Sequence, residues 1–224
     1  MRPVLIRQHG ESGPPGVLAE WLRAREIAWE VDSSWLGLEA PDPEGYEFVV
    51  SLGSKYSPRD ADEPSVAAEL RLLARAVERD VPVLGLCFGG QVLAAVLGGT
   101  VERAPRPELG WRTIHTDAPE LVPAGPWLEW HYERFTTPPG GEELARTDDA
   151  VQAFRLGPHL GVQFHPESTV DIVAGWAAKD RERVRALGID DTAALLDAPQ
   201  EQAEAARAAA FRLFDAFVEM RERV

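Results

Sequence analysis

Cysteine is almost absent from this sequence of 224 residues, in which Cys87 is the only one. A disulfide within the chain is therefore excluded, and the thiol is either a small buried hydrophobe or a reagent. Basic residues are also in deficit, because 23 Lys and Arg stand against 37 Asp and Glu for a formal net charge of −14. A field of this sign repels phosphate backbones and anionic lipids, so we expect neither a nucleic-acid nor a membrane partner.

Long apolar runs are missing as well. No stretch approaches the ~20 residues that a membrane span needs, and residues 1–16 lack the pattern of a signal peptide. A cytoplasmic location is therefore expected. The sequence has no G-x-x-x-x-G-K-[ST] loop, and its five histidines show no metal-ligand spacing with Cys or carboxylates. We accordingly expect no ATP site, no cofactor and no metal.

The first hundred residues alternate short apolar runs with helical patterns. Strands are predicted at 3–8, 48–52 and 81–86, and helices at 16–28, 64–79 and 89–97. The run at 81–86 is almost wholly apolar, as in a strand that is buried on both faces of a parallel sheet. This order predicts an α/β fold with a mixed, mostly parallel sheet, helices on both faces and active loops at the carboxyl ends of the strands.

From residue 100 the sequence pattern changes from alternating strands and helices to a series of short strands. Apolar-polar runs at 100–104, 110–116, 127–135, 151–156 and 159–165 predict antiparallel hairpins at the edge of the sheet. From Thr169 onward the pattern is helical, and residues 203–220 place one apolar stripe on a helix that should dock on the core (Ala206, Ala210, Leu213, Phe214 and Phe217). No linker or repeat divides the chain, so we expect one domain over 1–224, with 190–224 as a closing helical segment.

The pentapeptide at 85–89, GLCFG, lies between the predicted buried strand and the next helix. This is the G-x-nucleophile-x-G pattern of a strand-to-helix elbow. Glycines two residues before and after Cys87 remove the Cβ atoms that would clash in a sharp turn. The sulfur would then stand at a helix N-terminus, and the N–H of Phe88 would point to the place where an oxyanion forms.

A nucleophilic thiol needs a base, and the base needs a group that orients it. Both are supplied by GVQFHPE at 161–167, at the end of a predicted strand. Pro166 excludes a helix there and keeps the preceding residue extended, so His165 and Glu167 can face one cleft. The carboxylate can then accept from the imidazole and hold the tautomer that takes the thiol proton.

The segments VPVLGLCFGGQVLAAVLGG at 81–99 and GVQFHPE at 161–167 together resemble the class I (triad) glutamine amidotransferases. The segments ERAPRPELGW at 102–111 and WHYERFTTPPG at 130–140 are most similar to the free-standing bacterial branch of GMP synthase-like glutamine amidotransferases. The resemblance covers about residues 1–176. It implies a flavodoxin-like fold and hydrolysis of the glutamine side-chain amide through a γ-glutamyl thioester on Cys87.

The same resemblance implies roles for further residues. His165 would be the general base and acid, with Glu167 as its orienter. The second oxyanion N–H would come from Gly53, although Leu52 and Ser54 depart from the family's Gly-Gly-Pro loop. Substrate contacts would come from Gln91, in the family's C-x-G-x-Q motif, and from Tyr132 and Glu133, the two residues after His131. Tyr132 is bulkier than the usual glycine or serine, and Glu133 adds negative charge.

Three functions stay open at this level. The first is hydrolysis of glutamine, with the ammonia used by a separate synthetase or simply released. The second is hydrolysis of other γ-glutamyl amides, such as amine or peptide conjugates, by the same three residues. The third is a non-catalytic binding or regulatory subunit.

Overall fold

The computed structural model describes residues 2–33 and 39–221. The elements follow one another along the chain as β1 (Val4–Gln8), α1 (Gly16–Ala24), β2 (Trp29–Ser33), η2 (Pro43–Gly45), β3 (Val49–Ser51), α2 (Pro64–Glu78), β4 (Val83–Leu86), α3 (Phe88–Val96), β5 (Val101–Arg112), β6 (His115–Thr116), β7 (Trp127–Phe135), β8 (Glu142–Arg146), β9 (Val151–Leu156), β10 (His159–Val162), α4 (Val170–Lys179), α5 (Arg181–Arg185) and α6 (Gln200–Arg221). Within the described ranges, no helix combines the length and apolar character that crossing a membrane requires.

The central sheet has eight strands in the order β2-β1-β3-β4-β10-β9-β8-β6. The first five of these pair in parallel, and the last three add antiparallel partners at one edge. The predicted mixed, mostly parallel α/β fold is confirmed. Strand β4 lies in the middle of the sheet and all four of its residues are buried, as its apolar sequence requires.

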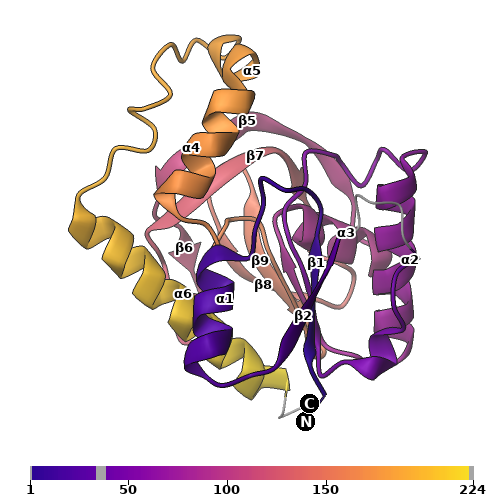
Figure 1. The fold of residues 1–224 in the computed structure, drawn as a ribbon. Helices are drawn as coiled ribbons and strands as arrows, with labels where there is room; N and C mark the ends of the chain where they lie inside the picture. The colour runs from indigo at the N-terminus through magenta and orange to yellow at the C-terminus, as the bar shows by residue number, and fades with distance from the viewer. Residues whose placement is uncertain (1, 34–38, 222–224) are drawn as a thin grey trace.

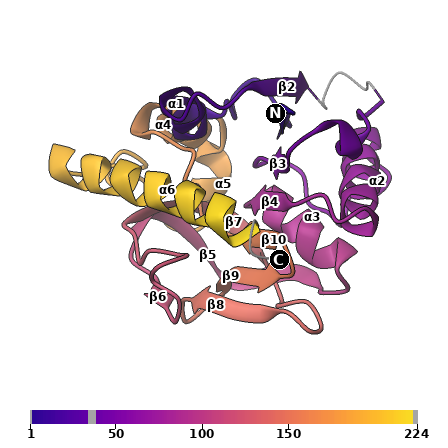
Figure 2. The ribbon, with the colours of Figure 1, turned by 90° about the horizontal axis from the view of Figure 1, so that it is seen from below.

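Helices cover both faces of this sheet (Figures 1 and 2). Side chains of neighbouring residues in one strand pack on opposite faces of the sheet, because side chains alternate along a strand. Val50 of β3 packs in a core with α1 and α6, whereas Val49 packs in a second core with α2 and α3.

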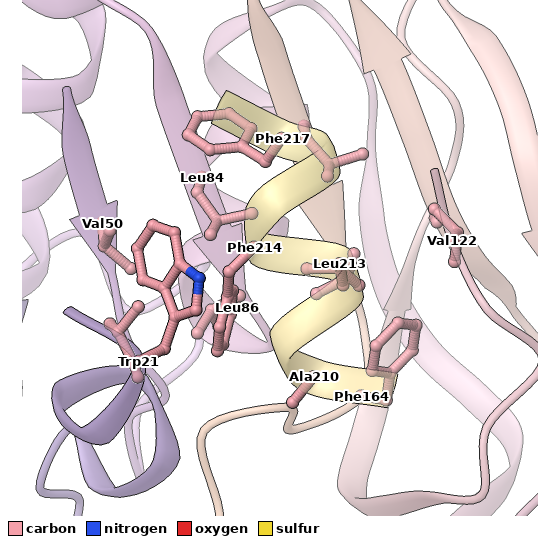
Figure 3. Packing of buried hydrophobic residues seen from close by; sticks show 14 of the residues in the cluster. Trp21, Val50, Leu84, Leu86, Val122, Phe164, Ala210, Leu213, Phe214 and Phe217 are labelled. Atoms are coloured by element: carbon pink, nitrogen blue, oxygen red, sulfur yellow. The ribbon is translucent and has the colours of Figure 1, made fainter. Parts of the chain in front are cut away.

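The closing helix α6 docks on the core as its apolar stripe predicts. Figure 3 shows Leu213, Phe214 and Phe217 packed over the sheet, close to Trp21 of α1. Each side chain buried in this way stabilises the fold by about 1.5–3 kcal/mol. Ala206 lies at the margin of the stripe and is only half-buried.

Two elements differ from the prediction in the first half. The helix expected over 16–28 ends at Ala24, because Glu26 takes a left-handed backbone with φ 55°. The following residues form β2, which the sequence did not predict. Strand β2 is an edge strand with no fully buried residue, so its sequence lacks the apolar run of an interior strand.

The expectation of hairpins at the sheet edge is only half right. Strands β8 and β9 do extend the sheet, although β8 was not predicted. Strands β5 and β7 instead pair with each other in a separate two-stranded antiparallel sheet. In β5, a register shift between Arg103 and Glu108 spans Pro105 and Pro107, which cannot donate ladder hydrogen bonds.

Candidate active site

The strand register brings two of the predicted site residues, Gly53 and Cys87, together with Gln163, which the sequence analysis did not single out. Ser51 of β3 pairs with Gly85 of β4, and Gly85 pairs with Gly161 of β10. Two residues further along each chain stand Gly53, Cys87 and Gln163. These three therefore lie beside one another beyond the carboxyl ends of parallel strands, where α/β proteins build their sites.

Cys87 occupies the predicted elbow between β4 and α3. Its backbone has φ 50° and ψ −105°, which is a strained conformation for a residue with a Cβ. A Cβ on Gly85 would come 2.5 Å from the carbonyl oxygen of Gly89, and one on Gly89 would come 2.1 Å from that of Ser51. Both glycines are thus required for close approach, as the motif predicts. Phe88 begins α3, so its N–H has no helix carbonyl to bind and is available to an anion.

His165 and Glu167 form the pair that the sequence predicts. Nδ1 of His165 lies 2.8 Å from Oε1 of Glu167, and both side chains are buried. The main-chain N–H of His165 donates to the carbonyl of Leu128 on β7, at 2.9 Å. The other ring nitrogen, Nε2, is buried with no hydrogen-bond partner in the part of the chain that the structure describes. It is the nitrogen left to exchange a proton with a thiol or a substrate.

The imidazole of His165 is flanked on two sides. A Cβ on Gly53 would come 2.9 Å from its Cε1, so only glycine leaves room there. On another side the ring of Trp176 of α4 lies 4.7 Å away between centroids, and the indole N–H donates to the carbonyl of Ser12 at 2.5 Å. Trp176 was not predicted to belong to the site, because no motif surrounds it.

The protonation of His165 follows from its surroundings. Burial lowers its pKa, but the negative charges of Cys87 and Glu167 outweigh this effect and hold the pKa well above 6.5. The imidazole is therefore a proton donor at neutral pH when the sulfur is charged. This is the state in which it can protonate a leaving nitrogen.

Gln91 and Glu133 meet next to the cysteine. The side-chain amide of Gln91 donates to the carbonyl of Glu133 at 3.3 Å and to Oε1 of Gln163 at 3.3 Å. The carboxylate of Glu133 accepts from Ser57 and lies 3.4 Å from Nη1 of Arg59. The charge that Glu133 adds is thus partly offset by Arg59.

Tyr132 points to the opposite side of β7 from His131 and Glu133. Its hydroxyl donates to Asp180 at 2.6 Å, and the guanidinium of Arg183 lies 3.4 Å from the ring centroid. Burial and the hydrogen bond to Asp180 raise the pKa of this hydroxyl. The bulk of Tyr132 is accommodated by contacts with Asp180, between α4 and α5, and with Arg183 of α5, so this side chain is used in packing.

A second buried ionisable cluster lies on β5 and β7. Nε2 of His131 is 3.3 Å from Glu108 and 3.3 Å from Glu129. Burial lowers the pKa of His131, but the closeness of these two carboxylates raises it to about 10. Its Nδ1 donates to the carbonyl of Glu133 at 2.9 Å, so the cluster braces the segment beside Gln91. Across 2–33 and 39–221, no group of three or more His, Cys, Asp or Glu is arranged to hold a metal ion.

A cysteine at a strand-to-helix elbow, with a His–Glu pair in the loop after the neighbouring parallel strand, is the arrangement of a cysteine-dependent hydrolase on an α/β fold. Comparison with known proteins narrows this class. A family model described as "Glutamine amidotransferase class-I" matches residues 43–172, which is more than half of the chain. The chain therefore belongs to the class-I glutamine amidotransferases, a family of enzymes.

Curated relatives and solved structures agree with this assignment. A separate subunit of the glutamine-hydrolyzing GMP synthase of Ignicoccus hospitalis is 34% identical over 140 residues, which cover 58% of this chain and 71% of the relative. The glutamine-hydrolyzing GMP synthase of Thermomicrobium roseum is 35% identical over 144 residues, or 61% of this chain, but this covers only 25% of that relative. A glutamine amidotransferase structure from Methylobacillus flagellatus has a TM-score of 0.89 with 26% identity, covering 98% of this chain and 95% of that one. The resemblance to GMP synthase-like amidotransferases is confirmed.

Proposed function

We propose that this enzyme hydrolyses the side-chain amide of glutamine to glutamate and ammonia, with Cys87 as nucleophile. The observation that carries the proposal is the pairing of the strained Cys87 elbow with the buried His165–Glu167 hydrogen bond of 2.8 Å in the loop after the adjacent strand β10. The relatives named above are glutamine-hydrolyzing GMP synthases or one subunit of such an enzyme, which supports glutamine as the substrate.

In the first half of the reaction, His165 takes the proton of Cys87 and the sulfur attacks the amide carbon. A C–S bond forms, and the negative charge on oxygen is met by the N–H groups of Gly53 and Phe88. The tetrahedral intermediate collapses with cleavage of the C–N bond. The imidazolium of His165 gives its proton to the nitrogen, so ammonia departs and a γ-glutamyl thioester remains.

In the second half, water attacks the thioester. His165 accepts a proton from this water, a C–O bond forms, and collapse breaks the C–S bond to free glutamate and the thiolate. Glu167 holds the imidazole in the required tautomer in both halves. Gln91 and the main chain at 132–133 hold the substrate. The hydrogen bond from Gln91 to the Glu133 carbonyl supports this role, because it places the two groups side by side.

We further propose that the ammonia passes to a synthetase on another chain, because relatives from Ignicoccus hospitalis and Sulfolobus acidocaldarius are single subunits of GMP synthase. The enzyme works in the cytoplasm, where a lone nucleophilic thiol stays reduced. Residues 1–224 act as one amidotransferase domain closed by 190–224. This is supported by α6, whose Phe214 and Phe217 share a core with Trp21 of α1.

The test compares glutamine hydrolysis by the wild type and by Cys87→Ala, alone and with candidate synthetases. Loss of activity in the variant, together with a γ-glutamyl adduct on Cys87 detected by mass spectrometry, supports the proposal. Equal rates in both proteins contradict it.

The structure weakens the second hypothesis, in which the substrate is a γ-glutamyl conjugate and not glutamine. The altered segment at 131–133 is one reason to consider such conjugates, but the Tyr132 side chain packs against Asp180 and Arg183. A panel of γ-glutamyl amides decides between the two substrates, because a conjugate hydrolase would favour a conjugate over glutamine.

A further inference from the structure

Gln163 is a buried side chain that contacts the nucleophile. It is fully buried, and its Nε2 lies 3.7 Å from Sγ of Cys87. Gln163 follows directly after β10, and His165 lies two residues further along the same loop. The sulfur therefore has Gln163 as a neighbour in addition to the acid-base residue.

The orientation of the Gln163 amide is fixed by its surroundings. Its Oε1 lies 3.3 Å from Nε2 of Gln91, a nitrogen that can only donate. A flipped Gln163 would set two NH₂ groups against each other and turn a carbonyl oxygen toward the sulfur. The observed assignment therefore follows from the network, with the N–H of Gln163 directed to Cys87.

The side chain of Gln91 is itself held by the segment that is proposed to contact the substrate. Its second N–H donates to the carbonyl of Glu133, which also accepts from Nδ1 of His131 at 2.9 Å. A continuous series of hydrogen bonds thus runs from the substrate segment through Gln91 and Gln163 to the sulfur. Both N–H groups of Gln91 are used, which leaves its carbonyl oxygen to accept from a substrate ammonium group.

We propose that Gln163 is a further catalytic residue, whose amide donates a hydrogen bond to the Cys87 sulfur whenever that sulfur carries charge, and that Gln91 is the positioning residue that aims it. The proposal rests on the proposed function, in which the sulfur is charged before it attacks and again when the thioester breaks. Neutral sulfur is a weak acceptor, so the bond is strongest in these charged states. A buried amide is costly unless it is bonded, and here both ends of it are bonded.

Two variants of Gln163 separate this role from simple packing. Gln163→Leu removes the donor, and Gln163→Glu keeps the shape but replaces the donor by an acceptor. The first measurement is the rate of Cys87 alkylation by iodoacetamide as a function of pH, which needs no substrate. The second is kcat and KM for glutamine, and thermal unfolding shows that each variant is folded.

We expect the midpoint of the alkylation profile to move to higher pH in both variants, further in Gln163→Glu. We expect kcat to fall about tenfold, as for the loss of one hydrogen bond to a charged group, with KM changed less than threefold. Gln91→Leu should move the alkylation midpoint in the same direction and also raise KM.

The matched control is Gln152→Leu, because Gln152 is an equally buried glutamine on β9 that bonds to Glu108 and not to Cys87. It should lower the unfolding temperature and leave the alkylation midpoint in place. A folded Gln163 variant with the wild-type alkylation midpoint and kcat overturns the proposal. Failure of the proposed function is seen separately, as glutamine hydrolysis that persists in Cys87→Ala.

Discussion

The main-chain N–H of Cys87 donates to the carbonyl oxygen of Val162 at 2.9 Å. This bond joins the nucleophile elbow to the last residue of β10, three residues before His165. A Cβ on Gly90 would come 2.5 Å from the same Val162 oxygen, so the first turn of α3 also packs directly on β10. The two motifs, at 85–89 and 161–167, are thus fixed to each other by main-chain contacts although they lie far apart in sequence.

Substitution of a glycine in the elbow and of a glycine on an exposed helix face should have opposite effects on stability. Gly89→Ala should destabilise the fold by about 1–3 kcal/mol or more, because its Cβ would overlap the Ser51 carbonyl at 2.1 Å. Gly175→Ala is the control, since Gly175 is exposed within α4 and a Cβ there meets nothing within 4 Å. It should stabilise the helix by about 0.5–1 kcal/mol. Urea unfolding measures both, and equal stability of the two variants would contradict the close packing at the elbow.

Gly53→Ala should impair turnover more than stability. The added Cβ would lie 2.9 Å from Cε1 of His165, which cannot move freely because Glu167 holds its Nδ1. Displacement of a catalytic group by a fraction of an ångström to 1 Å can cost up to about 10²-fold in rate. We expect kcat to fall while the unfolding temperature changes by a few degrees. Wild-type kcat in the variant would show that the imidazole has room.

Glu167→Gln should change both the rate and its pH dependence. The charge of Glu167 helps to hold the pKa of His165 well above 6.5. Activity requires the imidazolium as proton donor, so it falls as pH rises through this pKa. Removal of the charge lowers the pKa, and the fall should begin at lower pH, with kcat reduced by about 10²–10⁴-fold.

The measurement for Glu167→Gln is kcat/KM from pH 6 to 10. The matched control is Glu78→Gln, which removes the same charge from an exposed position at the end of α2. An alkaline limb that stays in place in Glu167→Gln would mean that another group controls it.

Two buried histidines should make the fold sensitive to mild acid. Burial lowers the pKa of His9 and of His159 to about 4. In the unfolded chain they bind protons near pH 6.5, so the unfolded state takes up more protons between pH 6.5 and 4. The folded state should therefore lose stability as pH falls through this window, by up to about 3 kcal/mol for each residue. Urea unfolding at pH 7, 5.5 and 4.5 tests this, and His159→Leu should flatten the slope.

Tyr132→Phe should separate packing from substrate contact. The variant loses the 2.6 Å hydrogen bond to Asp180 and keeps the ring beneath Arg183. Stability should fall by about 1.5–3 kcal/mol, the usual range for a bond to a charged acceptor. KM for glutamine should stay within twofold of the wild type. A tenfold rise in KM with unchanged stability would instead place the hydroxyl on the substrate.

The sequence alone was sufficient to predict those elements that depend on a few adjacent residues. The glycines around Cys87 indicate the elbow, and the apolar run at 81–86 indicates the strand β4, which is buried on both faces. Each of these follows from the steric and hydrophobic character of a few adjacent residues. Strand β2 was missed for the converse reason, because an exposed edge strand needs no apolar run.

Only the tertiary structure decided the relationships that depend on pairing between distant segments. It set β5 and β7 apart as their own sheet, turned Tyr132 toward Asp180, and brought Gln163 to the sulfur. The sequence by itself determined the α/β fold and the candidate nucleophile, base and orienter. Which side chains surround them follows from strand register and from the helices that cover each face, and both are fixed by packing over the whole chain.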